Sequence, residues 1–198
     1  MSTLELPSFQ TGGVDLGLRR AFYPLVGSTP RQMRALLALL GPMRSGRRFG
    51  AFTDWEIVWR YRHADDGGGR RICAVTVEVH ATITSPRWAP PRTAPAQLVA
   101  AWKDYAAAIE THEQGHIAVA VATAEGIRTR LMALRTLPSK TALAHAAEAV
   151  AEEELREARA REMSYDQITC HGATQGVVFP SDQIDADAPG GAILGRQG

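Results

Sequence analysis

The sequence is dominated by one long amphipathic segment that begins near Pro95 and continues to Ile127. Its inward-facing side chains recur at steps of three and four residues and fall within a stripe roughly 80° wide on a helix. The members of this stripe are Leu98, Trp102, Tyr105, Ile109, His112, His116, Val119, Thr123 and Ile127. The pattern predicts a single long helix that buries one face, so the rest of the chain has to pack against it.

Two histidines lie inside this stripe, one helical turn apart. The sequence His112-Glu113-Gln114-Gly115-His116 has the pattern H-E-x-x-H, which places both imidazoles on one side of a helix, where they can bind a single metal ion. Glu113 is rotated away by roughly 100° and can hold a water molecule beside that metal. Because two buried imidazoles without partners would be costly, the pattern favours a metal site over two core histidines.

A third ligand has to come from elsewhere, because a catalytic zinc ion uses three protein ligands. Val119 and Ala122 stand where the extended H-E-x-x-H-x-x-G-x-x-H pattern requires glycine and histidine. His171 is the best remaining nitrogen donor. The carboxylates that could take its place are Glu152, Glu153, Glu154 and Asp166.

The chain before the long helix predicts β-structure. Residues 53–62 and 72–84 both alternate between apolar and polar side chains, and the glycine-rich turn 65–69 joins them, which predicts an antiparallel hairpin. Residues 22–26 predict an edge strand. Residues 28–41 predict a helix that begins with a capping hydroxyl and a proline.

Two further segments bear on the site. The basic stretch from Arg44 to Gly50 is interpreted as a solvated turn. A second helix is predicted over roughly Lys140 to Ser164, followed by a polar segment, residues 165–172. Gly115 lies in a row of small side chains on the long helix, so another segment is expected to pack closely beside it. The other members of this row are Ala108, Ala122 and Gly126.

Composition sets the limits. The 198 residues carry a formal net charge of +1, which gives no overall field that would attract nucleic acid. No apolar run is long enough to span a membrane. We expect one domain over residues 1–180, with a loosely held arm over residues 1–20 and a disordered tail over residues 181–198. Cys73 and Cys170 can form one disulfide or remain free thiols.

Several motifs taken together resemble a known family. They are Thr53-x-Trp55-x-x-x-Trp59-x-Tyr61, Pro86-x-Trp88, Trp102-x-x-Tyr105, His112-Glu113-x-Gly115-His116, Tyr165-Asp166-x-x-Thr169-x-His171-Gly172 and Gln175-Gly176. Over residues 22–180 the chain resembles the bacterial family of predicted secreted zinc-dependent proteases, long catalogued only as a domain of unknown function. The resemblance implies zinc, peptide-bond hydrolysis and an envelope or extracellular location. The N-terminal sequence has no recognisable secretory signal, which leaves a cytoplasmic location open.

Residues and resemblance together predict an α+β, zincin-like fold, with a small antiparallel sheet packed on the long helix and a second helix. The expected site holds one Zn²⁺ ion on His112, His116 and His171, with water as the fourth ligand. Glu113 is the expected general base, and Tyr165 is a candidate to stabilise the oxyanion. By analogy with zinc peptidases, a peptide or protein substrate would lie along the 72–84 strand.

Two other functions fit the same residues. The first is a non-catalytic zinc protein, in which Cys170 or Asp166 completes a closed set of four ligands. The second is a binding module in which a surface of Trp55, Trp59 and Trp88 is the working part. The sequence leaves the oligomeric state and the cleaved sequence open.

Overall fold

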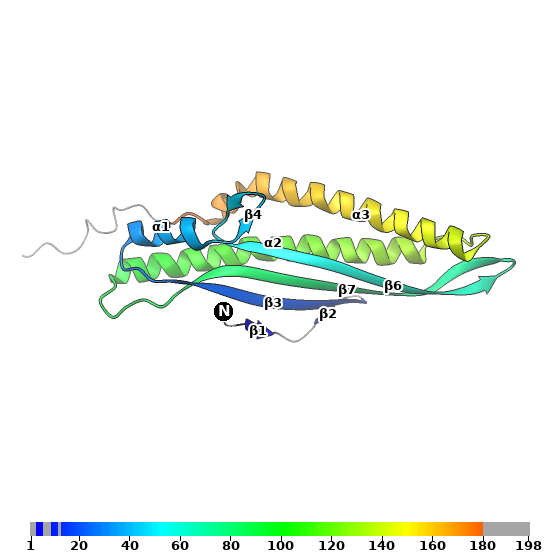
Figure 1. Ribbon diagram of the computed structural model, residues 1–198, viewed down its shortest axis with the longest axis horizontal. Helices are drawn as coiled ribbons and strands as arrows, with labels where there is room; N and C mark the ends of the chain where they lie inside the picture. The colour runs from blue at the N-terminus through cyan, green and yellow to red at the C-terminus, as the bar shows by residue number, and fades with distance from the viewer. Residues whose placement is uncertain (1–2, 6–8, 12, 180–198) are drawn as a thin grey trace, which may run out of the picture.

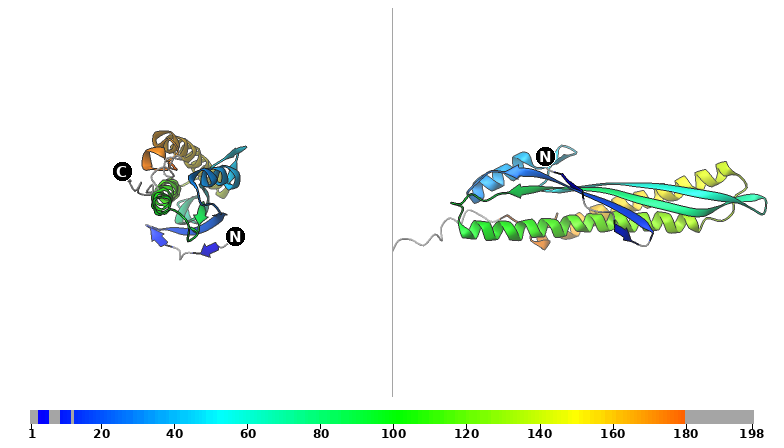
Figure 2. Two further views of the ribbon diagram at one scale, coloured as in Figure 1. Left: turned by 90° about the vertical axis from the view of Figure 1, so that its left-hand side faces the viewer. Right: turned by 90° about the horizontal axis from the view of Figure 1, so that it is seen from below.

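A computed structural model describes residues 3–5, 9–11 and 13–179 and shows a mixed α+β molecule of elongated shape. Its longest helix, α2 (Ala96–Met132), packs on the sheet with one side and on α3 (Lys140–Thr169) with another, as the views in Figures 1 and 2 show. The tail expected over residues 181–198 lies outside the described residues.

The sheet is built around one antiparallel hairpin. Strand β6 (Phe52–Asp66) pairs with β7 (Gly69–Trp88), and a register shift at Arg62/His63 marks an irregularity in the ladder. This pairing confirms the predicted hairpin. Both strands are longer than their alternating segments predict, because the chain continues the ladder to the turn at one end and to Trp88 at the other.

Strand β3 (Val14–Leu25) corrects two expectations. It pairs with β7 in parallel, from Val14 opposite Val77 to Leu25 opposite Trp88, so the sheet is mixed rather than antiparallel. The short strands β1 (Thr3–Glu5) and β2 (Phe9–Thr11) pair antiparallel with its other side. Residues 14–20 are therefore part of a strand and not a loose arm. The run at 22–26 is the end of that strand, and its residues 22–25 pair with β7 alone among the described residues, as expected of an edge.

The helices begin where the sequence places their caps. In α1 (Pro30–Leu40), the Thr29 hydroxyl accepts a hydrogen bond from the Gln32 backbone N–H at 3.3 Å. The Ser139 hydroxyl does the same for Ala142 at 3.1 Å and starts α3. However, α3 continues to Thr169, well beyond the predicted end at Ser164, so Tyr165 and Asp166 are helical. A short 3₁₀ turn, η1 (Ala173–Gln175), follows.

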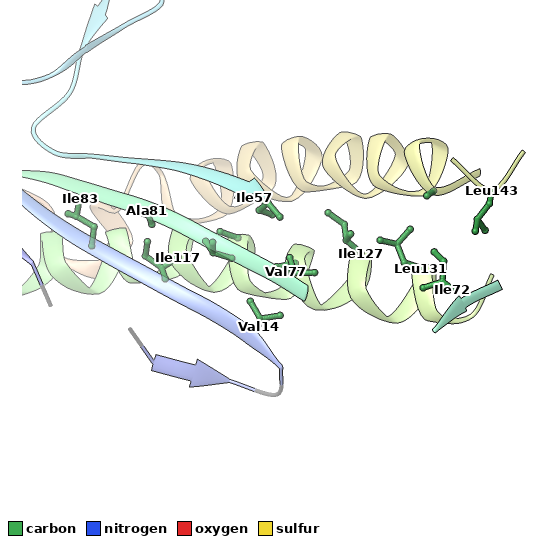
Figure 3. Close-up of a cluster of buried hydrophobic side chains, with 14 residues drawn as sticks. Val14, Ile57, Ile72, Val77, Ala81, Ile83, Ile117, Ile127, Leu131 and Leu143 are labelled. Carbon is green, nitrogen blue, oxygen red and sulfur yellow. The ribbon is translucent and has the colours of Figure 1, made fainter. Parts of the chain in front are cut away.

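Two hydrophobic clusters share α2 as their common wall. One lies between the sheet and the C-terminal half of α2 and includes Leu143 of α3, as Figure 3 shows. The other lies between α1, the ends of β3 and β7, and the N-terminal part of α2, where Trp88 and Trp102 meet edge to face. On α2 the first cluster begins at Ile117 and the second ends at Ile109. The residues of the H-E-x-x-H motif therefore lie between the two hydrophobic clusters.

Three smaller expectations are also settled. Cys73 and Cys170 are exposed and free, so they do not form a disulfide. Trp88 is buried, and Trp55 and Trp59 pack partly against the core, so the three rings do not form a common binding surface. Within the described ranges, none of the helices is long and apolar enough to cross a membrane.

Replacement of Ile127 tests the role of α2 as the common wall. Ile127 is fully buried against the sheet, so Ile127→Ala should lower the free energy of unfolding by about 2–5 kcal/mol. Ile168→Ala, at a position that is 74% exposed, is the matched control and should change it by less than about 0.5 kcal/mol. Urea unfolding measures both, and equal effects would contradict this packing.

Candidate metal centre

The two histidines of the motif are buried side by side on α2. His112 and His116 are 6% and 8% exposed, and their ring centroids lie 4.9 Å apart. Both rings lie towards α3, which packs alongside α2 and supplies contacts to each of them. Burial of two polar rings is costly unless every ring nitrogen has a partner. Both Nδ1 atoms have a hydrogen-bond partner here, and both Nε2 atoms lie near Asp166.

The Nε2 atoms of both rings converge on one carboxylate oxygen. His112 Nε2 and His116 Nε2 each lie 3.3 Å from Oδ1 of Asp166, which α3 supplies. The three residues form the one group of possible metal ligands found among the described residues, with ligand atoms within 4.8 Å of one another. Ligands of a tetrahedral ion with bonds of about 2.0–2.1 Å lie about 3.3–3.4 Å apart, so this donor set fits a metal ion.

The Nδ1 atoms fix the orientation of both rings. His112 Nδ1 lies 2.9 Å from Oε1 of Gln175, and His116 Nδ1 lies 2.6 Å from Oε2 of Glu162. Amide and carboxylate oxygens only accept hydrogen bonds, so both Nδ1 atoms are the donors. In the neutral rings the Nε2 atoms then carry the lone pairs that face Asp166, which is the tautomer that binds a metal.

The acidic groups near His116 favour a positive charge at the site. Burial lowers the pKa of His112, and the Gln175 hydrogen bond offsets only part of that effect. Burial also acts to lower the pKa of His116, but the hydrogen bond and the charge of Glu162 outweigh it, so this pKa is raised. The second oxygen of Glu162, Oε1, is buried and has no hydrogen-bond partner in the described part of the chain. A cation held by the Nε2 atoms would supply the missing positive charge.

Glu113 is held by the sheet on the other side of the site. Its Oε2 accepts a hydrogen bond of 2.6 Å from the Thr53 hydroxyl at the start of β6. Burial raises the pKa of the Glu113 carboxyl, partly offset by the Thr53 hydrogen bond and the nearby His116. A raised pKa and a fixed orientation are the properties that a carboxylate needs to take up a proton from water.

Tyr165 packs directly against His112. Its ring stacks on His112 with centroids 5.2 Å apart, and its hydroxyl donates to the His112 carbonyl oxygen at 3.0 Å. The same hydroxyl accepts a hydrogen bond from Gln175 Nε2 at 3.1 Å. The hydroxyl is thus bonded to α2 and to Gln175, and the ring helps to orient His112. A role for Tyr165 in stabilising an oxyanion stays a prediction.

Gly115 explains how α3 can approach so closely. A Cβ atom at this position would lie 2.0 Å from the Tyr165 hydroxyl oxygen and 2.1 Å from its ring carbon Cζ. The prediction that another segment packs beside the small residues of α2 is therefore confirmed, and the segment is α3. Farther along, Gly126 faces the Glu154 carboxylate in the same way.

The predicted third ligand, His171, lies outside the group of three. Its side chain is 58% exposed, and its Nδ1 is 3.6 Å from Oδ2 of Asp166, the carboxylate oxygen that faces away from the other two histidines. Asp166, one of the candidate carboxylates, is the third member of the group of possible ligands. The physical reason is that α3 extends to Thr169 and brings Asp166 inward one turn after Glu162, whereas His171 follows the helix end in a left-handed conformation.

The three consecutive glutamates of α3 lie away from the histidines. Glu153 and Glu154 form ion pairs with Arg130 of α2. Glu152 is exposed on the outer side of α3. This acidic run therefore contributes to the contact between the two long helices and supplies no ligand to the histidines.

A cavity of about 390 Å³ opens beside the histidines. One wall carries His112, His116 and Asp166, and the opposite wall is formed by residues 47–53, which lead into β6. Strand β7 has neighbours on both sides, so the 72–84 strand cannot add a peptide along its edge, contrary to expectation. The strand that borders the cavity and ends the sheet is β6.

Sequence reasoning missed three residues that complete the site, Thr53, Glu162 and Gln175. Glu162 could have been found, because it lies four residues before Asp166 and therefore on the same face of a helix that continues to Thr169. Gln175 belongs to the Gln175-Gly176 motif, but nothing in that motif indicates which residue it contacts. Thr53 gave no local signal, because its partner Glu113 is 60 residues away.

Comparison with known protein families gives one match. Residues 20–172 match a family described as bacterial protein of unknown function, DUF922. The chain belongs to this family. No curated protein and no solved structure matches it. Zinc dependence and proteolysis stay predictions.

A substitution at Gly115 tests the contact between α2 and α3. Gly115→Ala should lower the free energy of unfolding by about 1–3 kcal/mol, because the new methyl overlaps the Tyr165 ring. Alanine is intrinsically the better helix residue by about 1 kcal/mol, so the sign of the change is informative. Gly126→Ala is the comparison and should cost less, because the Glu154 carboxylate it meets is the end of a flexible side chain. A more stable Gly115→Ala protein would exclude a rigid contact.

Proposed function

We propose that this chain is a zinc-dependent metallopeptidase with a zincin-like active site. The observation that carries the proposal is the convergence of His112 Nε2 and His116 Nε2 on Asp166 Oδ1, both at 3.3 Å, in a cavity that Glu113 also lines. The position of Glu113, directly after the first histidine, is that of the general base in the H-E-x-x-H pattern.

Zinc is the metal that suits this donor set best. Two imidazole nitrogens and one carboxylate oxygen are a ligand set that occurs in catalytic zinc sites, which keep the fourth position open. Both imidazoles are oriented by hydrogen bonds from Nδ1 to oxygen atoms, an arrangement typical of zinc-binding histidines. Hard cations such as Mg²⁺ and Ca²⁺ prefer oxygen ligands instead.

When bound, zinc would supply Lewis acidity that polarises a carbonyl group and lowers the pKa of water. The protein's own residues do the rest. Glu113, held by the Thr53 hydroxyl, is oriented to accept a proton from water and to pass it to the leaving amine. Glu162 and Gln175 hold the two imidazoles, and the stacked Tyr165 ring keeps His112 from rotating.

Strand β6 gives the substrate a place to bind. It is the last strand of the sheet on its side, and its first residues, Phe52 and Thr53, line the cavity. An extended peptide can hydrogen-bond to the main chain of such an edge, which is a common mode of peptide recognition. We propose that the peptide lies along the β6 edge rather than along the 72–84 strand.

The open cavity also favours catalysis over a purely structural zinc site. A structural site is closed by four protein ligands, whereas the group of possible ligands in the described residues holds three. Cys170, which would close a structural site as the fourth ligand, is exposed and outside the group.

Metal binding by two variants distinguishes the ligand sets. Asp166→Ala should weaken zinc binding by more than about 100-fold, because loss of a direct ligand costs more than loss of a residue that supports one. His171→Ala, which removes a histidine on the same cavity, is the control and should retain one equivalent of zinc. Competition with a chromophoric chelator measures both affinities. The reverse result would restore His171 as the third ligand.

Glu113→Gln tests the catalytic role separately from metal binding. The variant should keep one equivalent of zinc and lose peptide hydrolysis by about 10²–10⁴-fold, because the amide cannot accept the proton of water. Glu125→Gln makes the same change at an exposed position of α2 and should behave as the wild type. Hydrolysis of a denatured protein by zinc-loaded samples is the measurement. Unchanged activity in Glu113→Gln would rule out this mechanism.

A further inference from the structure

The basic segment is solvent-exposed over residues 43–48, as expected of a solvated turn, and its end also lines the cavity beside the histidines. It folds as a small hairpin of β4 (Met43–Arg44) and β5 (Arg47–Arg48), directly before β6. Arg47 and Arg48 line the same cavity as Glu113 and Asp166. We propose that this hairpin selects peptides with an acidic side chain close to the cleaved bond. The proposal rests on the peptidase function proposed above.

The arginines of the hairpin are not equivalent. Arg44 forms an ion pair with Asp54, and its guanidinium group lies over the Phe52 ring at 4.8 Å from the centroid. Arg48 donates one hydrogen bond of 2.8 Å to the Gly41 carbonyl oxygen. Arg47 lies 5.9 Å from the centroid of the Phe49 ring. Within the described residues, neither Arg47 nor Arg48 forms an ion pair with a carboxylate, so both keep donors for one from a ligand.

The charge of the surrounding chain supports an acidic ligand. Residues 16–53 contain seven arginines and no aspartate or glutamate, although the whole chain has a net charge of only +1. Two of these arginines, Arg20 and Arg44, are ion-paired with Glu110 and Asp54. Arg47 and Arg48 are the two that line the cavity. A charged wall of this kind attracts and orients ligands of opposite sign.

The chemistry of the wall fits a glutamate or aspartate side chain. Arginine presents a fork of N–H donors that matches a carboxylate. Phe49 and Phe52, which line the cavity beside the arginines, can cover the methylene groups that carry such a carboxylate.

The test uses fluorescence-quenched peptides that differ only in whether one position near the cleaved bond holds Glu, Ser or Lys. Wild-type, zinc-loaded protein should cleave the best Glu peptide at least about tenfold faster than its Lys counterpart, with Ser between them, as expected for a charge pair in a partly enclosed site. The preference should shrink when salt is raised from about 0.05 to 0.5 M.

The variant R47S/R48S should lose the preference while still cleaving the Ser peptide. Arg31→Ser removes an exposed arginine of α1 that does not line the cavity and should keep the preference. Equal rates for Glu and Lys peptides, or a preference that survives in R47S/R48S, would overturn the proposal. A third outcome would also overturn the proposal: R47S/R48S no longer binds anionic lipid vesicles but selects peptides as the wild type does. The two arginines would then belong to a membrane-facing surface.

A second readout separates this proposal from the peptidase function. The same peptides, carrying a fluorophore, are titrated with the zinc-loaded Glu113→Gln variant, and binding is followed by fluorescence anisotropy. If wild-type protein cleaves nothing, the peptidase proposal fails, but tighter binding of the Glu peptide that depends on Arg47 and Arg48 would still support the acidic-ligand site. Equal binding of Glu and Lys peptides would overturn it.

Discussion

The close contact between α2 and α3 at Gly115 is the constraint on which the site depends. With any side chain at this position, the Tyr165 ring could not lie on α2, where a Cβ atom would meet it at 2.0–2.1 Å. Tyr165 and Asp166 are neighbours on the last turns of α3, and Glu162 precedes Asp166 by one turn. A shift that moved Tyr165 away would therefore also move the carboxylates that face His112 and His116.

The contact between α2 and α3 provides the two buried histidines with polar partners. Each imidazole uses Nδ1 to reach an oxygen atom and leaves Nε2 facing Asp166. The resulting cluster is rich in acceptors, and the raised pKa of His116 shows that its surroundings favour a positive charge. The hydrophobic clusters on either side exclude water and fix α2 against the sheet, so the ring positions are set by packing that does not depend on the ligand.

Local patterns predicted most helices and the hairpin, because their signals lie within the element itself. Thr29 and Pro30 start α1, and the alternation of residues 53–62 identifies β6. The pairing of β3 with β7 could not be predicted this way, because parallel strands meet through a long connection. The alternation of Val14, Leu16 and Leu18 was nevertheless a usable signal. His112, Glu113 and His116 followed from spacing on one helix, whereas Asp166 required knowing where a second helix ends and how closely it packs.

The two walls of the cavity differ in charge and in the roles of their residues. The helical wall is largely buried and carries Glu113, Glu162 and Asp166, and it provides the possible ligands and the groups that hold them. The wall of residues 47–53 is basic and aromatic, and Thr53 ties it to the helical wall through Glu113. The same short segment orients Glu113 through Thr53 and presents Arg47 and Arg48 to the cavity. Contacts of a bound peptide with these two arginines would therefore also position that peptide beside Glu113. Selection and catalysis would then both depend on the start of β6, and substitutions there should affect both together.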